Sequence, residues 1–116
     1  MELVALLGTG KGTWGQVSGL IKHGEWDKII IIGDEFVKKF DPQKEAEFIT
    51  LKMNQPVLIL RDLLISNLKN KIRGPEIALT IASGEGKEHM ALISALLNIP
   101  VGIKFVALTK DGVVEL

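Results

Sequence analysis

The sequence predicts an α/β fold: a Rossmann-like, doubly wound, mostly parallel sheet of about six strands that ends in an antiparallel β-hairpin. Three observations lead to this prediction. Short apolar runs alternate along the chain with segments of helical periodicity. These runs are nearly continuous, as in parallel strands that helices cover on both faces. The dipeptide Asp111-Gly112 favours a tight hairpin turn, so the last two strands are predicted to be antiparallel.

The first predicted strand, helix and second strand lie within residues 3–32. Residues 3–7 form an unbroken apolar run and are predicted as the first strand. The following helix has apolar residues at helical spacing: Trp14, Val17, Leu20 and Ile21. His23-Gly24 gives this helix a cation in its last turn and a glycine stop. The second strand covers residues 29–32 and ends at Gly33-Asp34.

The middle of the chain is predicted to continue the alternation. Asp41 is expected to cap a second helix, with Pro42 at the first helical position. Its predicted buried stripe is Ala46, Ile49 and Met53. The apolar residues 56–60 are predicted as the third strand. A third helix is predicted over residues 62–71, with Leu64 and Leu68 on one face, before Gly74-Pro75 ends it.

The last third of the chain is predicted to hold three strands and one helix. Residues 77–81 are the fourth strand, and residues 87–97 are a helix whose inward side chains are Met90, Ile93 and Leu97. Residues 101–108 form the fifth strand. The turn at Asp111-Gly112 then returns residues 113–116 as a short antiparallel edge strand.

Two glycine-rich turns follow the first and fourth predicted strands. The first turn is Gly8, Thr9, Gly10, Lys11, Gly12, Thr13, Trp14 and Gly15, and the second is Ser83, Gly84, Glu85, Gly86 and Lys87. With the common strand order 3-2-1-4-5, strand order reverses between the first and fourth strands, where doubly wound folds bind ligands. Glycine permits close backbone approach, and the N-terminus of each following helix favours an anion. The sequence therefore predicts one ligand site built from both turns.

Composition limits the function classes. A chain of 116 residues, 47% hydrophobic and 24% charged, is predicted to be a single folded domain over residues 1–116. Lys+Arg and Asp+Glu each number 14, which argues against a protein that coats duplex nucleic acid. The absence of cysteine excludes disulfides and thiolate metal sites. No metal or other cofactor is expected.

The expected location is the cytoplasm, without membrane contact. The N-terminus lacks a basic leader region, and no apolar run approaches the roughly 18 residues of a membrane helix. The lack of cysteine, with many Ile, Lys and Glu residues, hints at a thermophilic source.

The first turn fits a dinucleotide-binding fingerprint only in part. Gly10, Gly12 and Gly15 match G-x-G-x-x-G, but this match begins two residues after the strand. In the register that starts at Gly8, Thr13 replaces the third glycine. Asp34 stands where a ribose-binding carboxylate is expected. A tight strand-to-helix turn without a ligand remains the alternative.

The second turn is neither a P-loop nor a nucleophile elbow. Both motifs require glycine at the position of Ile81, and a P-loop requires Ser or Thr at the position of Glu88. Ser83 is thus expected to cap a helix or contact a ligand. Lys87, like Lys11 in the first turn, can reach an anionic ligand or remain solvated. Trp14 is expected to pack or to stack on a base, and the isolated residues His23 and His89 are not expected to bind metal.

The second turn also resembles a known family. The apolar fourth strand, the turn Ser83-Gly84-Glu85-Gly86-Lys87-Glu88-His89-Met90 and the aliphatic helix over residues 91–97 resemble the fourth-strand motif of CRISPR-associated Rossmann-fold (CARF) sensor domains. The turn over residues 8–15 sits where that family has its other ligand-binding loop. The terminal hairpin over residues 101–116 also fits its six-stranded core, so the resemblance covers nearly the whole chain.

The resemblance implies a homodimer that binds a cyclic oligoadenylate across its two-fold axis. The protein would sense or sequester this ligand in CRISPR-linked antiviral signalling. Some members of the family also cleave their ligand without a metal, by attack of a ribose 2′-hydroxyl on the adjacent phosphate. Ser83 and Lys87 would be the catalytic residues of such a ring nuclease, whose rate should be slow because no general base is evident.

Two other functions remain open. Gly8, Gly10, Gly12 and Asp34 also suit a mononucleotide- or dinucleotide-binding domain. The chain is too short to add the substrate domain of a dehydrogenase. A structural homodimer without a small ligand would explain the high apolar content.

Overall fold

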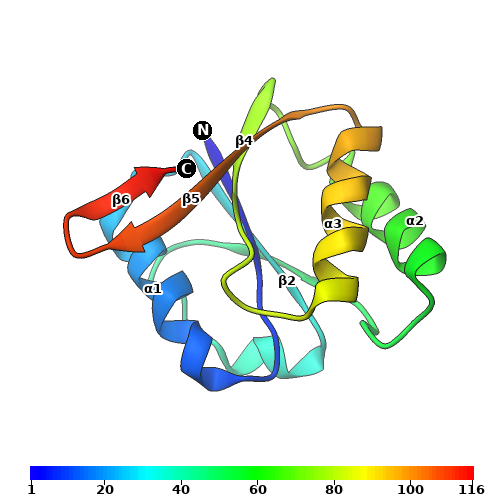
Figure 1. Cartoon of the computed structure of the whole chain (residues 1–116), viewed down its shortest axis with the longest axis horizontal. Coiled ribbons are helices and arrows are strands. Elements are labelled where there is room, and N and C mark those ends of the chain that lie inside the picture. The colour runs from blue at the N-terminus through cyan, green and yellow to red at the C-terminus, as the bar shows by residue number, and fades with distance from the viewer.

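The computed structural model describes residues 1–116, except for the side chain of Lys11. In this part of the chain, six strands form one sheet in the order β3-β2-β1-β4-β5-β6 (Figure 1). The strands are β1 (Glu2–Leu6), β2 (Lys28–Gly33), β3 (Glu47–Thr50), β4 (Glu76–Thr80), β5 (Gly102–Thr109) and β6 (Gly112–Glu115). The helices are α1 (Trp14–His23), α2 (Val57–Leu68) and α3 (Gly86–Asn98), with the 3-10 helices η1 (Lys11–Thr13) and η2 (Glu35–Lys39). The predicted fold class is confirmed.

Strand pairing places β1 at the centre of the sheet. Val4 of β1 lies opposite Ile30 of β2 and Leu79 of β4, in parallel register on both sides. β3 extends the parallel sheet beyond β2, and β5 extends it beyond β4. Only the β5–β6 pair is antiparallel, as the Asp111-Gly112 turn predicts. The sheet therefore reverses its order between β1 and β4.

Two apolar cores lie on opposite faces of the sheet. One contains Val4 and Leu6 of β1 with the buried side chains of α2 and α3. The other contains Leu3 and Ala5 of β1 with buried side chains of α1 and η2. Figure 1 shows the same division, with α1 on one side of the sheet and α2 and α3 on the other. Strands covered on both faces must be apolar throughout, which explains the unbroken runs in the sequence.

The predicted helix over residues 41–53 is wrong. Asp41 does cap a turn, since its Oδ1 accepts a hydrogen bond from Gln43 N at 2.9 Å. Gln43, however, has φ +58°, a left-handed conformation that a right-handed helix cannot continue. Residues 47–50 instead form β3, where Glu47 pairs with Lys28 of the neighbouring strand and with Lys71.

The predicted strand over residues 56–60 is also wrong, because these residues begin α2. Leu60, Leu64 and Leu68 recur at intervals of four and are fully buried, whereas Leu58 and Ile59 are 61% and 49% exposed. A short apolar run alone does not distinguish a buried strand from a helix. The helix begins after Pro56 rather than at residue 62. The third strand of the predicted order is thus real but comes from residues 47–50.

The remaining predicted elements are confirmed to within two residues. The predicted inward face of the last helix is wrong, because Met90 and Leu97 are 64% and 62% exposed. The buried side chains of α3 are instead Ala91, Leu92, Ala95 and Leu96. None of the helices in the described part of the chain is long and apolar enough to cross a membrane.

Candidate functional site

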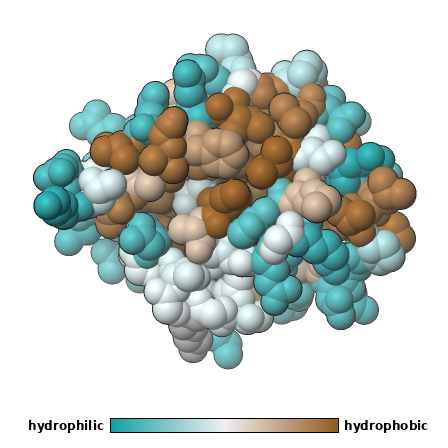
Figure 2. All heavy atoms as spheres, viewed as in Figure 1, coloured by the Kyte–Doolittle hydropathy of each residue, from teal (hydrophilic) through white to brown (hydrophobic). Residues whose placement is uncertain are grey.

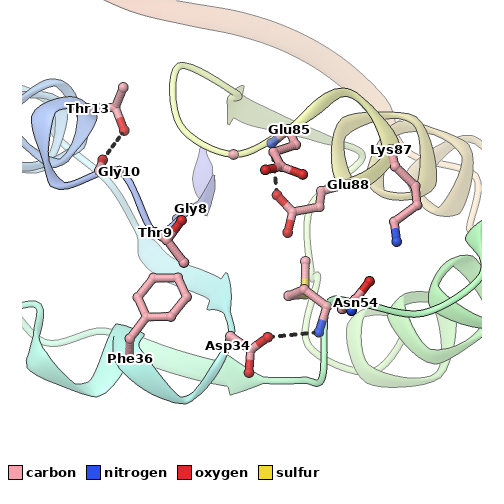
Figure 3. Close-up of a pocket in the computed structure, with 12 residues that line it drawn as sticks. Gly8, Thr9, Gly10, Thr13, Asp34, Phe36, Asn54, Glu85, Lys87 and Glu88 are labelled. Atoms are coloured by element: carbon pink, nitrogen blue, oxygen red, sulfur yellow. Dashed lines mark hydrogen bonds between the residues drawn. The ribbon is translucent and has the colours of Figure 1, made fainter.

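A cavity of about 530 Å³ opens at the carboxyl ends of β1, β2 and β4. We call it the switch-point pocket, because it lies where the strand order reverses. Its lining residues come from both glycine-rich turns, from the end of β2 and from the loop after β3 (Figure 3). They are Gly8, Thr9, Gly10, Thr13, Asp34, Phe36, Met53, Asn54, Gly84, Glu85, Lys87 and Glu88.

The two turns touch backbone to backbone at one edge of this pocket. A Cβ atom on Gly8 would lie 2.7 Å from both Cα and N of Gly84. Gly84 has φ +95°, and a Cβ there would lie 2.6 Å from Cδ2 of Leu6. Both positions therefore require glycine, one for close approach and the other also for its conformation. Two segments separated by 75 residues become a single wall.

Ser83 ties the two turns together beneath that wall. Its side chain is buried, and its Oγ accepts a hydrogen bond from Gly8 N at 2.8 Å. The Thr13 hydroxyl lies 2.7 Å from the same Oγ and 2.9 Å from the carbonyl oxygen of Gly10. When Thr13 donates to Gly10, Ser83 can donate to Thr13, so one arrangement of protons satisfies both hydroxyls. Ser83 thus fixes the distance between the turns.

His89 supports the second turn from the first turns of α3. Its Nε2 lies 2.8 Å from the carbonyl oxygen of Ser83. A carbonyl oxygen can only accept, so Nε2 carries the proton of this hydrogen bond. The spacing of His89 in the sequence gave no sign of this role, because its partner is a backbone atom. His89 therefore helps to position the residue that joins the turns.

The N-terminus of α3 faces the pocket, and the backbone N of its N-cap residue, Glu85, already bonds a carboxylate. Glu88 Oε1 accepts a hydrogen bond from Glu85 N at 2.8 Å, as in a capping box. Figure 3 shows the Glu85 and Glu88 carboxylates beside the pocket, with Lys87 next to them. With Asp34, three carboxylates and one ammonium group are among the described lining side chains. The pocket is acidic over this part of its lining.

Both carboxylate oxygens of Asp34 accept hydrogen bonds from backbone N atoms. Its Oδ1 caps η2 by accepting from Glu35 N at 3.1 Å, and its Oδ2 accepts from Met53 N at 3.1 Å. The second bond fixes the loop after β3 against the end of β2, and this loop carries Asn54. Each carboxylate oxygen keeps a further lone pair for a ligand.

An aromatic stack forms a further wall of the pocket. The rings of Trp14 and Phe36 are stacked at 6.1 Å with an angle of 14° between their planes, and Phe40 meets Trp14 edge-on at 5.6 Å. Trp14 Nε1 donates to the carbonyl oxygen of Gly8 at 2.9 Å, which ties the stack to the first turn. Trp14 therefore packs behind the pocket, and Phe36 is the ring that lines it.

The structure brings most of the predicted site residues together. Those that line the pocket are Gly8, Thr9, Gly10, Thr13, Asp34, Gly84, Glu85 and Lys87. Gly12 and Gly86 do not line it, Trp14 lies behind it and Ser83 lies beneath it. The predicted ligand contact of Lys11 rests on a side chain outside the described part of the structure.

Sequence reasoning missed Phe36, Met53, Asn54 and Glu88. Met53 and Asn54 were hidden by the incorrect helix, since a third strand at residues 47–50 puts the next residues at the carboxyl edge of the sheet. Phe36 follows the end of β2 and could have been found by the same rule.

A second cavity, of about 590 Å³, lies at the other end of the strands, beside the amino ends of β1, β2 and β4. Buried Glu2 is one of its lining residues and accepts hydrogen bonds from the backbone N atoms of Arg73 and Gly74, both at 2.8 Å. This geometry fixes the turn before β4. We favour the switch-point pocket as the functional site because ligands bind at the carboxyl ends of the strands in open α/β sheets.

No model of a known protein family matches the chain, and no curated protein matches its sequence. Among the described residues, no group of three or more His, Cys, Asp and Glu side chains could hold a metal ion.

Proposed function

We propose that the protein binds a nucleotide ligand in the switch-point pocket, and that the ligand is a cyclic oligoadenylate. One observation carries this proposal: Ser83 joins two glycine-rich turns into a single wall at the reversal of strand order. A wall of this kind lets a phosphate approach the backbone closely and meet the N-terminus of α3. The resemblance of the second turn to CARF sensor domains suggests the particular ligand.

The charge of the lining favours a phosphodiester over a more densely charged phosphate. Each linkage of a cyclic oligoadenylate carries one negative charge, whereas a nucleoside triphosphate brings several charges to one place. Lys87 is the cation among the described lining side chains, which also include the carboxylates of Glu85, Glu88 and Asp34. A single charge can be matched by Lys87 and the helix N-terminus. Several charges would meet repulsion from the carboxylates.

The proposal includes a homodimer, supported by an exposed apolar band. The band consists of Met90, Ile93 and Leu97 on α3 with Ile103 and Phe105 on β5. Met90 and Leu97 are 64% and 62% exposed, and the other three are partly buried. Figure 2 shows hydrophobic residues gathered over β5 and the neighbouring side of α3. On this face of the sheet, the described helices are α2 and α3. β5 is followed by the hairpin strand β6 and not by a further helix that could cover the band.

The position of this band suits a symmetric ligand. Met90 lies one helical turn beyond Lys87, so the band begins next to the switch-point pocket. A second copy docked on the band would bring an identical pocket close by. Two-fold related pockets fit a ligand that itself has two-fold symmetry.

Slow cleavage of the bound ring is part of the proposal. The 2′-hydroxyl of one ribose would attack the adjacent phosphorus and form a 2′,3′-cyclic phosphate. The bond from phosphorus to the 5′-oxygen would break, and that oxygen would take up a proton. Lys87 would stabilise the charge on the phosphate, while Ser83, buried beneath the wall, would align the turns.

The test is to incubate the purified protein with cyclic tetra-adenylate or cyclic hexa-adenylate in the absence of metal. Melting temperature is read at once, and chromatography follows the integrity of the ligand over hours. A raised melting temperature with intact ligand indicates a sensor or ligand sink. Loss to linear products indicates a ring nuclease.

Lys87→Ala should weaken binding and abolish any cleavage. Lys69→Ala, a change on an exposed lysine at the far end of α2, is the matched control. The absence of both a thermal shift and ligand loss in the unmodified protein would refute this function.

A mononucleotide or dinucleotide is the second candidate ligand, favoured by the presence of Asp34 in the pocket lining. It predicts that NAD or a related nucleotide raises the melting temperature and that Asp34→Asn reduces the affinity. A ligand-free structural dimer is the third candidate. It predicts a stable dimer that Leu97→Glu disrupts, with no thermal shift from any nucleotide.

A further inference from the structure

The pocket has two chemically different sides. Figure 3 shows Phe36, Asp34 and Asn54 along the lower side of the cavity in this view, with Glu85, Glu88 and Lys87 above them. The first side comes from the ends of β2 and β3, and the second comes from the turn after β4. The glycine turns and Lys87 suit a phosphate. Phe36 and Asn54 on the first side are uncharged and suit a different part of a ligand.

Phe36 offers a fixed aromatic surface to a ligand. Its ring stacks on Trp14 at 6.1 Å, and Trp14 is held in place by its bond to the Gly8 carbonyl and by the edge of Phe40. The Phe36 side chain is partly exposed and lines the pocket. A ring that is already immobilised loses little conformational entropy when a planar base stacks on it.

Asn54 offers an amide to the edge of such a base. Its side chain lines the pocket, and among the described residues no protein group hydrogen-bonds its amide. The adjacent backbone N of Met53 is fixed by Asp34 Oδ2 at 3.1 Å, which limits where Asn54 can lie. A side-chain amide has one acceptor and two donor hydrogens. On the edge of the base that carries N7, it therefore matches the N6 donor and N7 acceptor of adenine, but not the two acceptors O6 and N7 of guanine.

We propose that Phe36 and Asn54 form an adenine-binding subsite, with Phe36 stacking on the base and Asn54 reading its edge. This inference rests on the proposed function and extends it by assigning the base to one side of the pocket. Asp34 positions the subsite by capping η2, which begins one residue before Phe36, and by fixing the loop of Asn54. The phosphate then points across the pocket toward Lys87.

The experiment measures dissociation constants for cyclic tetra-adenylate and cyclic tetraguanylate by calorimetry. Phe36→Leu removes the ring but keeps apolar volume, and Phe48→Leu, on a 37% exposed phenylalanine of edge strand β3, is its matched control. Phe36→Leu should weaken binding of the adenine ring roughly tenfold, given the usual contribution of base stacking. Phe48→Leu should leave the affinity unchanged.

Asn54→Ala tests the subsite without disturbing the core, since Asn54 is an exposed loop residue. It should lower the preference for adenine over guanine by roughly tenfold. Lys87→Ala should weaken both ligands by the same factor, because a phosphate contact does not depend on the base. Asn70→Ala, in the exposed turn after α2, is the matched control.

The outcomes separate this inference from the proposed function. Binding of cyclic tetra-adenylate that depends on Lys87 but is unchanged by Phe36→Leu and Asn54→Ala would overturn the adenine subsite and leave the function standing. Equal affinities for the adenine and guanine rings in the unmodified protein would also overturn it. Failure of every nucleotide to bind the unmodified protein would overturn both.

Discussion

Replacing Ser83 by alanine should destabilise the whole domain, although Ser83 lies in a turn. The side chain is 1% exposed, and its Oγ is the acceptor for the buried hydrogen bond from Gly8 N. Alanine removes that acceptor and the partner of the Thr13 hydroxyl. Leaving a buried donor without an acceptor costs about 1–3 kcal/mol.

The expected shift in melting temperature follows from the size of the domain. Unfolding entropies near 2.1 cal/mol/K per residue give about 0.24 kcal/mol/K for this chain. A loss of about 2 kcal/mol therefore lowers the melting temperature by about 8 °C. Differential scanning calorimetry of the unmodified protein and the variant measures this shift.

The matched control is Ser94→Ala, a change at a partly exposed serine on α3. This control should alter stability by less than about 0.5 kcal/mol. Thr13→Val and the double variant complete a cycle, in which Ser83 and Thr13 should couple because their hydroxyls are 2.7 Å apart. Equal stability of the Ser83 and Ser94 variants would refute the idea that Ser83 joins the turns.

Three further predictions concern the pocket and the edge of the sheet. Gly84→Ala should destabilise the protein by about 1–3 kcal/mol in urea unfolding, since the new Cβ meets Leu6 and φ is positive; unchanged stability would contradict the left-handed conformation of Gly84 and its close contact with Leu6. Glu88→Gln should tighten binding of cyclic tetra-adenylate about fivefold in calorimetry, because it removes a charge but keeps an oxygen for Glu85 N. Glu45→Gln, a change on an exposed loop, should have no effect on that affinity. Hydrogen bonds from Lys71, and then from Lys28, lower the pKa of Glu47 from its usual value of 4.5. The ionised Glu47 carboxylate therefore stabilises the fold at pH values above 4.5, and this stabilisation is lost as the pH falls through the lower folded pKa. The melting temperature of the Glu47→Gln variant should therefore depend less on pH in this acidic range than that of the unmodified protein.

The fold was predictable because the signals for its buried strands are local. Residues 3–7 and 77–81 are apolar without interruption, as strands covered on two faces must be. The hairpin follows from the turn chemistry of Asp111-Gly112, and Gly112 indeed has φ +105°. Strand order then follows from the general rules of doubly wound sheets.

The errors fall where tertiary contacts overrule local preference. Residues 47–50 fit the helical spacing of Ala46, Ile49 and Met53, yet they extend the sheet, where Ile49 is buried and Glu47 pairs with Lys28 and Lys71. The left-handed Gln43 leaves no mark in the sequence that separates it from a helical glutamine. The apolar run at residues 57–60 becomes the first turn of α2 because one of its side chains, Leu60, continues the buried stripe of Leu64 and Leu68.

The candidate site was predictable in outline and not in detail. The positions of the two turns after β1 and β4 were enough to place them together. That Ser83 lies beneath the wall depends on distances across 75 residues, which no local pattern encodes. The same applies to Phe36 and Asn54, whose shared side of the pocket depends on the correct third strand.

Chemical-shift mapping of the backbone amides during titration with cyclic tetra-adenylate tests the central claim most directly. The claim is that both turns form one ligand site. It predicts that the amides of Gly8 and Gly10 shift together with those of Gly84 and Glu85, with the same dissociation constant. Shifts confined to one turn, or centred on Gly74 at the other end of the strands, would contradict it.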